Sequence, residues 1–112
     1  MAVTPKKLIP GSQLTAVAVN YYTTPANTKA LVKKLTLTNN DATARTFTLY
    51  LVPSGGSPAA SNLLSKAISI AAGAVYEAFE AEGHILMAGD SIQALADVAA
   101  MVTIQASGVE IV

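Results

Sequence analysis

Apolar and polar side chains alternate at every second position through much of this chain, and turn-forming residues interrupt the alternation at short intervals. Period two is typical of a half-buried β-strand, because successive side chains of a strand point to opposite faces of the sheet. Residues 45–52 are the clearest case, since Phe47, Leu49 and Leu51 alternate with threonine and tyrosine until Pro53 ends the run. We predict a strand there, with these three apolar side chains facing the core.

The same pattern predicts further strands between turns that contain Gly, Pro, Asn or Asp. They cover residues 14–22, 30–38, 68–70, 75–79, 84–87, 92–96, 100–106 and 108–112. In the second of these, Leu31, Leu35 and Leu37 share one face with Lys33. Residues 59–66 could begin with a helical turn. Residues 93–101 have high helix propensity, but the β-branched residues 102–104 that follow favour a hairpin.

About seven or eight strands at spacings of about 8 to 12 residues are typical of an all-β fold, an antiparallel β-sandwich or jelly roll. With 112 residues the chain has room for one core of ordinary size. We therefore expect one β-sandwich domain over residues 14–112, preceded by an N-terminal arm, residues 1–13. Because the arm carries Lys6 and Lys7, it is a plausible docking strap. Residues 53–58 form the longest flexible loop and the candidate functional tip.

The composition points to an assembly rather than to a free monomer. Only 12% of the residues are charged, 52% are hydrophobic, and the mean hydropathy is +0.45. We expect part of the exterior to be buried in a homo-oligomer or a docked complex. The formal net charge of zero argues against non-specific nucleic-acid binding. No apolar run is long enough for a signal peptide or a membrane span, and the absence of cysteine excludes disulfides and fits a reducing cytosol.

Basic and acidic residues are unevenly placed along the chain. All seven basic residues lie in the first 66 positions, and six of the seven acidic residues follow Val75. One interpretation is that early and late strands pair, so that the charges meet across strands. The other is a bipolar subunit that packs a basic surface against the acidic surface of a neighbour.

Candidate catalytic and metal-binding groups are isolated. His84, the one histidine, has Glu80, Glu82 and Asp90 nearby in sequence, but without thiolates this is a poor transition-metal set, and we interpret His84 as solvent-facing. Ser57 is not in a nucleophile elbow, and no phosphate-binding loop follows the adjacent glycines. We therefore predict no catalytic, cofactor-binding or metal-binding residue, no cofactor, and a protein that is not an enzyme.

Aromatic residues offer little for sugar binding, which usually depends on exposed rings, because tryptophan is absent. The tyrosines are Tyr21, Tyr22, Tyr50 and Tyr76. Tyr21 and Tyr22 must point to opposite faces if the segment is extended, so we expect one of them in the core. The other would then be exposed, and packing at a subunit interface is the favoured role for it.

Three stretches carry a resemblance to a known group of proteins. They are Tyr22-Thr23-Thr24-Pro25-Ala26-Asn27-Thr28-Lys29-Ala30 with residues 35–40 and 48–53, the segment Gly83 to Ala94, and the ending Ala106 to Ile111. Over residues 20–112 the chain resembles small β-rich virion structural proteins of tailed bacteriophages. The resemblance implies jelly-roll or sandwich subunits that decorate the capsid or belong to the tail.

From the resemblance and the composition we expect a capsid decoration or cement protein, made in the host cytoplasm and located in the virion. It would act as a homo-oligomer on the major capsid protein or another virion protein, without contact to nucleic acid or membrane. The alternative is a tail-associated or fibre-associated adhesion module that binds a host surface glycan through residues 53–58. A bacterial domain of unrelated role that shares the fold is a third possibility.

Overall fold

The computed structural model describes residues 2–112, and within them the chain forms strands joined by turns and one short 3-10 helix. The strands are β1 (Val3–Gln13), β2 (Val19–Thr23), β3 (Lys29–Asn39), β4 (Arg45–Val52), β5 (Leu63–Ile70), β6 (Val75–Glu77), β7 (Ile85–Leu86), β8 (Ser91–Ala96) and β9 (Val102–Ile111). The 3-10 helix η1 (Ala60–Asn62) lies where a helical turn was possible. The all-β prediction is confirmed. No helix among these residues is long and apolar enough to cross a bilayer.

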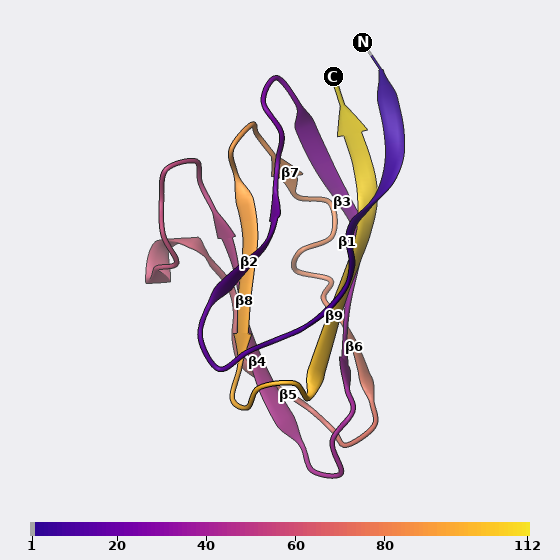
Figure 1. Cartoon of the computed structure of the whole chain (residues 1–112), viewed down its shortest axis with the longest axis vertical. Helices are drawn as coiled ribbons and strands as arrows, with labels where there is room; N and C mark the ends of the chain where they lie inside the picture. The colour runs from indigo at the N-terminus through magenta and orange to yellow at the C-terminus, as the bar shows by residue number, and fades with distance from the viewer. Residues whose placement is uncertain (1) are drawn as a thin grey trace.

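Two antiparallel sheets pack against each other (Figure 1). One has the order β1-β9-β3-β6, with β7 also paired to β3, and the other has the order β2-β8-β4-β5. Because β6 and β7 both pair with β3, they occupy one position in their sheet, which leaves two layers of four positions. The chain changes sheet at nearly every connection, and this is the arrangement of a jelly roll. The predicted β-sandwich or jelly roll is confirmed.

The first thirteen residues differ from the predicted arm. Met1 lies outside the described residues, but β1 is an edge strand that pairs with β9 along its length. The pairing continues to the chain ends, where Ala2 and Val112 exchange two backbone hydrogen bonds of 3.0 and 2.9 Å. The physical reason is burial, since Leu8 and Ile9 of β1 are core residues. Pro5 and Pro10 are compatible with this position because an edge strand needs partners on one side only.

Two connections also differ from the sequence-based prediction. Residues 14–18, predicted as strand, cross from one sheet to the other, and Leu14 is fully buried where they do so. Residues 97–101, predicted as the turn of a hairpin, make a second crossing, because β8 pairs with β2 and β4 whereas β9 pairs with β1 and β3. The hairpin prediction was therefore wrong. The two crossings meet, since the Leu14 N–H donates to the Val102 carbonyl at 2.7 Å.

The core lies between the sheets and contains the residues that the clearest strand predicted. Phe47 and Leu49 are fully buried, and Leu51 is half-buried. In β3, however, a register shift between Val32 and Lys34 marks a β-bulge. A bulge changes which face the following residues take. Val32 therefore joins the buried Leu35 and Leu37 in the core, whereas Leu31 projects from the opposite face.

The molecule is elongated, with principal extents of 46 × 26 × 19 Å. Ala2 and Val112, the ends of the described chain, lie together at one end of the sandwich, which we call the terminal end (Figure 1). The turn between β3 and β4 lies at the opposite end, and the loop that contains η1 projects from the side of the four-stranded sheet (Figure 1). Along the strands, the outer face of the five-stranded sheet therefore has two halves. The terminal half is next to the chain ends, and the other half is next to the turn between β3 and β4.

Candidate interaction surface

A row of apolar side chains crosses the outer surface of the five-stranded sheet in its terminal half. Pro5 of β1 and Leu31 of β3 both lie opposite Val109 of β9. Leu31 is in turn paired with Ile85 of β7. Because directly paired residues of adjacent strands project from the same face, these four side chains form one row across all positions of the sheet.

A second row runs parallel to the first, closer to the chain ends. Val3 of β1 and Lys29 of β3 both lie opposite Ile111 of β9. Met87 follows two positions after Ile85 and lies beside this row, because a hollow of about 550 Å³ is lined by Lys29, Met87 and Ile111 together. We call the seven apolar members of both rows the apolar face. They are Val3, Pro5, Leu31, Ile85, Met87, Val109 and Ile111.

The burial of neighbouring residues shows that this face points to solvent. Ala30 and Leu86, which flank these positions on β3 and β7, are each 1% exposed and therefore face the core. By alternation their neighbours Leu31 and Ile85 face outward. Val3, Ile85 and Met87 are 58%, 62% and 51% exposed, respectively. Contiguous exposed apolar side chains on a soluble domain mark an interaction surface.

The other half of the same outer surface is mainly polar, as expected for the solvent side of an antiparallel sheet. There Thr36 lies between Gln105 and Glu77. The next outward row places Thr38 between Thr103 and Val75, and Val75 is a single exposed apolar side chain in this row. The apolar face is therefore a local feature and not a general property of the sheet. Exposed lysines border it, and these are Lys7, Lys29, Lys33 and Lys34.

The uneven charge distribution has two structural results. Early and late charges do meet, because Lys6 lies 3.3 Å from Glu110 across β1 and β9, and Arg45 lies 3.6 Å from Asp97. On the five-stranded sheet, Lys7 lies on the β1 edge and Glu77 lies on the opposite, β6 edge. The interpretation that early and late charges meet is therefore confirmed, and the packing of a basic surface against a neighbour's acidic surface stays a prediction.

On the core side of the terminal half, Tyr22 connects the five-stranded sheet to the four-stranded sheet. Its side chain is buried, and its phenol donates a hydrogen bond of 2.5 Å to Glu110. The prediction that one of the adjacent tyrosines is a core residue is confirmed. Tyr21 is half-buried and its hydroxyl donates to the backbone carbonyl of Gln13 at 3.3 Å. It packs against the core cluster and is not the exposed interface residue that we expected.

A groove of about 420 Å³ lies beside the loop after β4, and Pro53, Asn62, His84 and Asp90 are among its lining residues. His84 is exposed. The Asp90 carboxylate accepts hydrogen bonds from the backbone N–H groups of Ser54 at 3.0 Å and Met87 at 2.9 Å, so it holds two loops in place. Within residues 2–112 no three His, Cys, Asp or Glu side chains are grouped so that they could hold a metal ion.

The carboxylate of Glu80, also near His84 in sequence, is engaged elsewhere. It accepts hydrogen bonds from the hydroxyl of Ser65 on β5 and from the phenol of Tyr76 at 3.1 Å. Tyr76 in turn packs against Phe47 with ring centroids 5.3 Å apart. Glu80 thus connects the two sheets along one side of the sandwich. Ser57 lies in the exposed loop.

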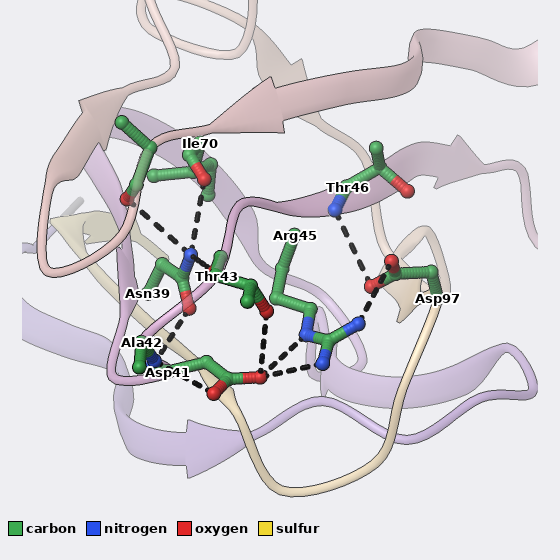
Figure 2. A network of polar contacts seen from close by, with 9 residues as sticks. Asn39, Asp41, Ala42, Thr43, Arg45, Thr46, Ile70 and Asp97 are labelled. Carbon is green, nitrogen blue, oxygen red and sulfur yellow. Dashed lines mark hydrogen bonds and ion pairs between the residues drawn. The ribbon is translucent and has the colours of Figure 1, made fainter.

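A second polar network closes the end opposite the termini (Figure 2). The fully buried amide of Asn39 donates to the backbone carbonyls of Thr43 at 2.9 Å and Ile70 at 3.0 Å. Beside it, the Arg45 guanidinium lies 2.6 Å from Asp41 and lowers the pKa of that carboxyl. These groups satisfy one another and tie together the loops of both sheets, so the network is structural.

Neither a protein-family model nor a curated protein sequence matches this chain. Among solved structures, it is similar to a chain in the structure of infectious bursal disease virus, Gx strain, with a TM-score of 0.52 and 10% sequence identity. The superposition covers 97% of this chain and 31% of the viral chain, so this chain spans about a third of that chain's length. The likeness shows a shared fold.

Proposed function

We propose that this chain is a structural subunit of a virus particle and, more specifically, a non-enzymatic capsid decoration or cement protein of a tailed bacteriophage. The observation that carries the proposal is the apolar face, which a jelly-roll domain presents to solvent in the absence of a partner. The resemblance of residues 20–112 to small phage virion proteins supports it. So does the fold shared with a chain from a virus structure.

In this role the protein would add contact area between neighbouring shell subunits. Burial of apolar surface contributes about 25 cal/mol for each Å² removed from water, so the apolar face favours a buried position. With only 12% of its residues charged, the chain also loses little ion hydration on docking. Rigid attachment of many copies would oppose the outward pressure on a filled shell.

Electron microscopy of the parent particles tests this function. Antibodies raised against the purified chain and coupled to gold would be applied to intact virions. We expect gold over the whole shell. Gold confined to the tail tip would overturn the decoration role in favour of the tail, and particles without gold, with the chain also absent from their denatured proteins, would overturn the virion role.

A tail-associated or fibre-associated adhesion module is the second candidate, and the groove beside residues 53–58 is the observation that favours it. Ser61 and His84 offer hydrogen-bonding groups there, whereas the Asn62 amide bonds to the backbone of Ala59 and Ser57 within its own loop. The groove's lining contains no Tyr or Phe side chain on which a sugar ring could stack. Binding of the intact chain to a panel of bacterial surface oligosaccharides, abolished by His84→Ala, would support adhesion, and the absence of binding at millimolar sugar would contradict it.

A further inference from the structure

We propose that the partner of the apolar face is a second copy of this chain, packed face to face about a two-fold axis that runs parallel to the strands. This inference rests on the proposed function for its place in a virus particle and names the partner of the same surface. The symmetric unit that decorates the shell would then be a dimer, with the outer faces of the two five-stranded sheets in contact.

The order of the strands makes the apolar face complementary to itself. A two-fold axis between β9 and β3 places β1 of one copy over β7 of the other, and β9 over β3. The row Pro5, Val109, Leu31, Ile85 then meets the same row in reverse order. Each side chain of this row faces an apolar side chain of the partner, as in the aligned packing of two sheets. In the second row, Ile111 faces Lys29 of the other copy.

The charges that border the face agree with this axis. Lys7 is exposed on the β1 edge, and Glu77 is on the β6 edge of the same outer surface. Reversal of the strand order brings Lys7 of each copy over the edge that carries Glu77 of the other. The two positions differ in height by two residues, because Lys7 is level with Lys34 and Glu77 with Thr36. That offset is about 7 Å, which a lysine side chain can span.

A two-fold axis perpendicular to the strands is less favourable. If such an axis passed through the centre of the apolar face, the polar halves of the two sheets would point in opposite directions. Only the terminal halves of the two copies would then be in contact. Lys7 would then lie far from Glu77 of the partner. Lys29, the one charged member of the second row, can extend its apolar stem along the interface and place its ammonium group at the rim.

The two open edges of the five-stranded sheet are less suited to joining two copies. β1 contains Pro5 and Pro10, which cannot donate backbone hydrogen bonds, and two lysines. The opposite edge is interrupted, since β6 and β7 have three and two residues. Strand addition at either edge would therefore be short, whereas face-to-face packing uses the rows in full.

Analytical ultracentrifugation of the intact chain over a range of concentrations tests the dimer. We expect the parent chain to dimerise and Ile85→Asp to weaken dimerisation at least 100-fold. Val17→Asp is the matched control, because Val17 is 68% exposed and lies outside the apolar face. Circular dichroism would show that both variants remain folded. A parent chain that stays monomeric at millimolar concentration, or equal weakening by both variants, would overturn the proposal.

A charge exchange tests the axis. Lys7→Glu and Glu77→Lys should each weaken dimerisation about tenfold, and the double variant should recover most of the loss. Within one copy these residues lie on opposite edges of the sheet, about 14 Å apart or more, so recovery can only arise between copies. Losses that simply add in the double variant would overturn this arrangement.

Vesicles distinguish a lipid surface from a second copy, since an apolar face with lysines could also meet an anionic bilayer. Co-sedimentation of the chain with phosphatidylserine and phosphatidylcholine vesicles is expected to be negligible. Binding that Ile85→Asp abolishes, together with a monomeric parent chain, would replace the dimer by a membrane-binding role. Gold labelling of the shell with a monomeric chain would retain the proposed function and reject only the dimer.

Discussion

The phenol of Tyr22 on β2 donates a hydrogen bond of 2.5 Å to the carboxylate of Glu110 on β9, and so joins the two sheets directly behind the apolar face. Glu110 stands between Val109 and Ile111, which point outward, while its own side chain points inward. Lys6 approaches the same carboxylate at 3.3 Å. The contact therefore fixes the strand that contributes the centre of the interaction surface.

Removal of this phenol should destabilise the fold. A hydrogen bond to a charged group contributes about 1.5 to 3 kcal/mol, and Lys6 remains as a partner of Glu110, so Tyr22→Phe is expected to cost about 2 kcal/mol. Urea unfolding followed by circular dichroism measures the loss. Tyr50→Phe, on the outer face of the other sheet, is the control and should change stability by less than about 0.5 kcal/mol. Equal stability of the parent and Tyr22→Phe would show that the contact contributes nothing.

Acid should weaken the fold through the same carboxylate. The hydrogen bond from Tyr22 and the nearby Lys6 lower the pKa of Glu110 below its ordinary value of 4.5. The folded state then holds the proton less tightly than the unfolded state, so the stabilisation is complete above pH 4.5 and is lost as the pH falls through the lowered pKa. In Glu110→Gln the free energy of unfolding should fall less steeply below pH 4.5. The same slope as in the parent chain would contradict this linkage.

Local pattern could predict the elements but not their distribution between sheets. The limits of β4 agree with the predicted strand, because Phe47 and Leu49 alternate without interruption until Pro53. The crossings at residues 14–18 and 97–101 carry no local signal, because a jelly roll is defined by pairing between segments far apart in the chain. Leu14 is apolar in either arrangement, so its identity does not distinguish strand from crossing.

The apolar face was missed for two local reasons. The bulge between Val32 and Lys34 moved Leu31 outward, and bulges have no reliable sequence signature. The sequence pattern predicts two strands, residues 100–106 and 108–112, whereas residues 102–111 form the single strand β9. Gly108 allows the close approach of β3, because a Cβ atom there would collide with the carbonyl of Leu31. Taken as one strand, residues 102–111 have apolar side chains on both faces. Up to Ala106 the apolar residues are at the positions that face the core, and from Val109 on they are at the alternate positions, which face outward. This shift in the apolar pattern is the signal that could have revealed the surface.

The end of the sandwich opposite the termini should depend on Asn39. Its amide group donates to the carbonyls of Thr43 and Ile70, and Asn39→Ala would remove this donor from both, including the buried contact with Ile70 (Figure 2). An unsatisfied buried group costs about 1 to 3 kcal/mol, so we expect a loss of about 3 kcal/mol in thermal or urea unfolding. Asn40→Ala is the matched control, since Asn40 is exposed. A loss no larger than the control's would argue against this role.

Glu82 should have the opposite effect on stability from Glu110. One oxygen of its carboxylate is buried without a hydrogen-bond partner among residues 2–112. Burial, and after it the neighbouring Glu77, raise the pKa of Glu82 above 4.5, and the Leu35 backbone and Lys34 offset this only in part. The folded state therefore binds the proton more tightly than the unfolded state, and ionisation weakens the fold as the pH rises from 4.5 through the raised pKa.

Glu82→Gln removes that charge at nearly constant shape. The variant should have a higher urea midpoint than the parent at pH 7, and the difference should vanish at pH 4, where the parent carboxyl is already protonated. Glu80→Gln is the matched comparison, because the Glu80 carboxylate accepts hydrogen bonds from Ser65 and Tyr76 and its replacement should lower the midpoint at pH 7. If Glu82→Gln were also less stable at pH 7, the ionised carboxylate would be favourable in the fold and the assigned direction of its pKa would be wrong.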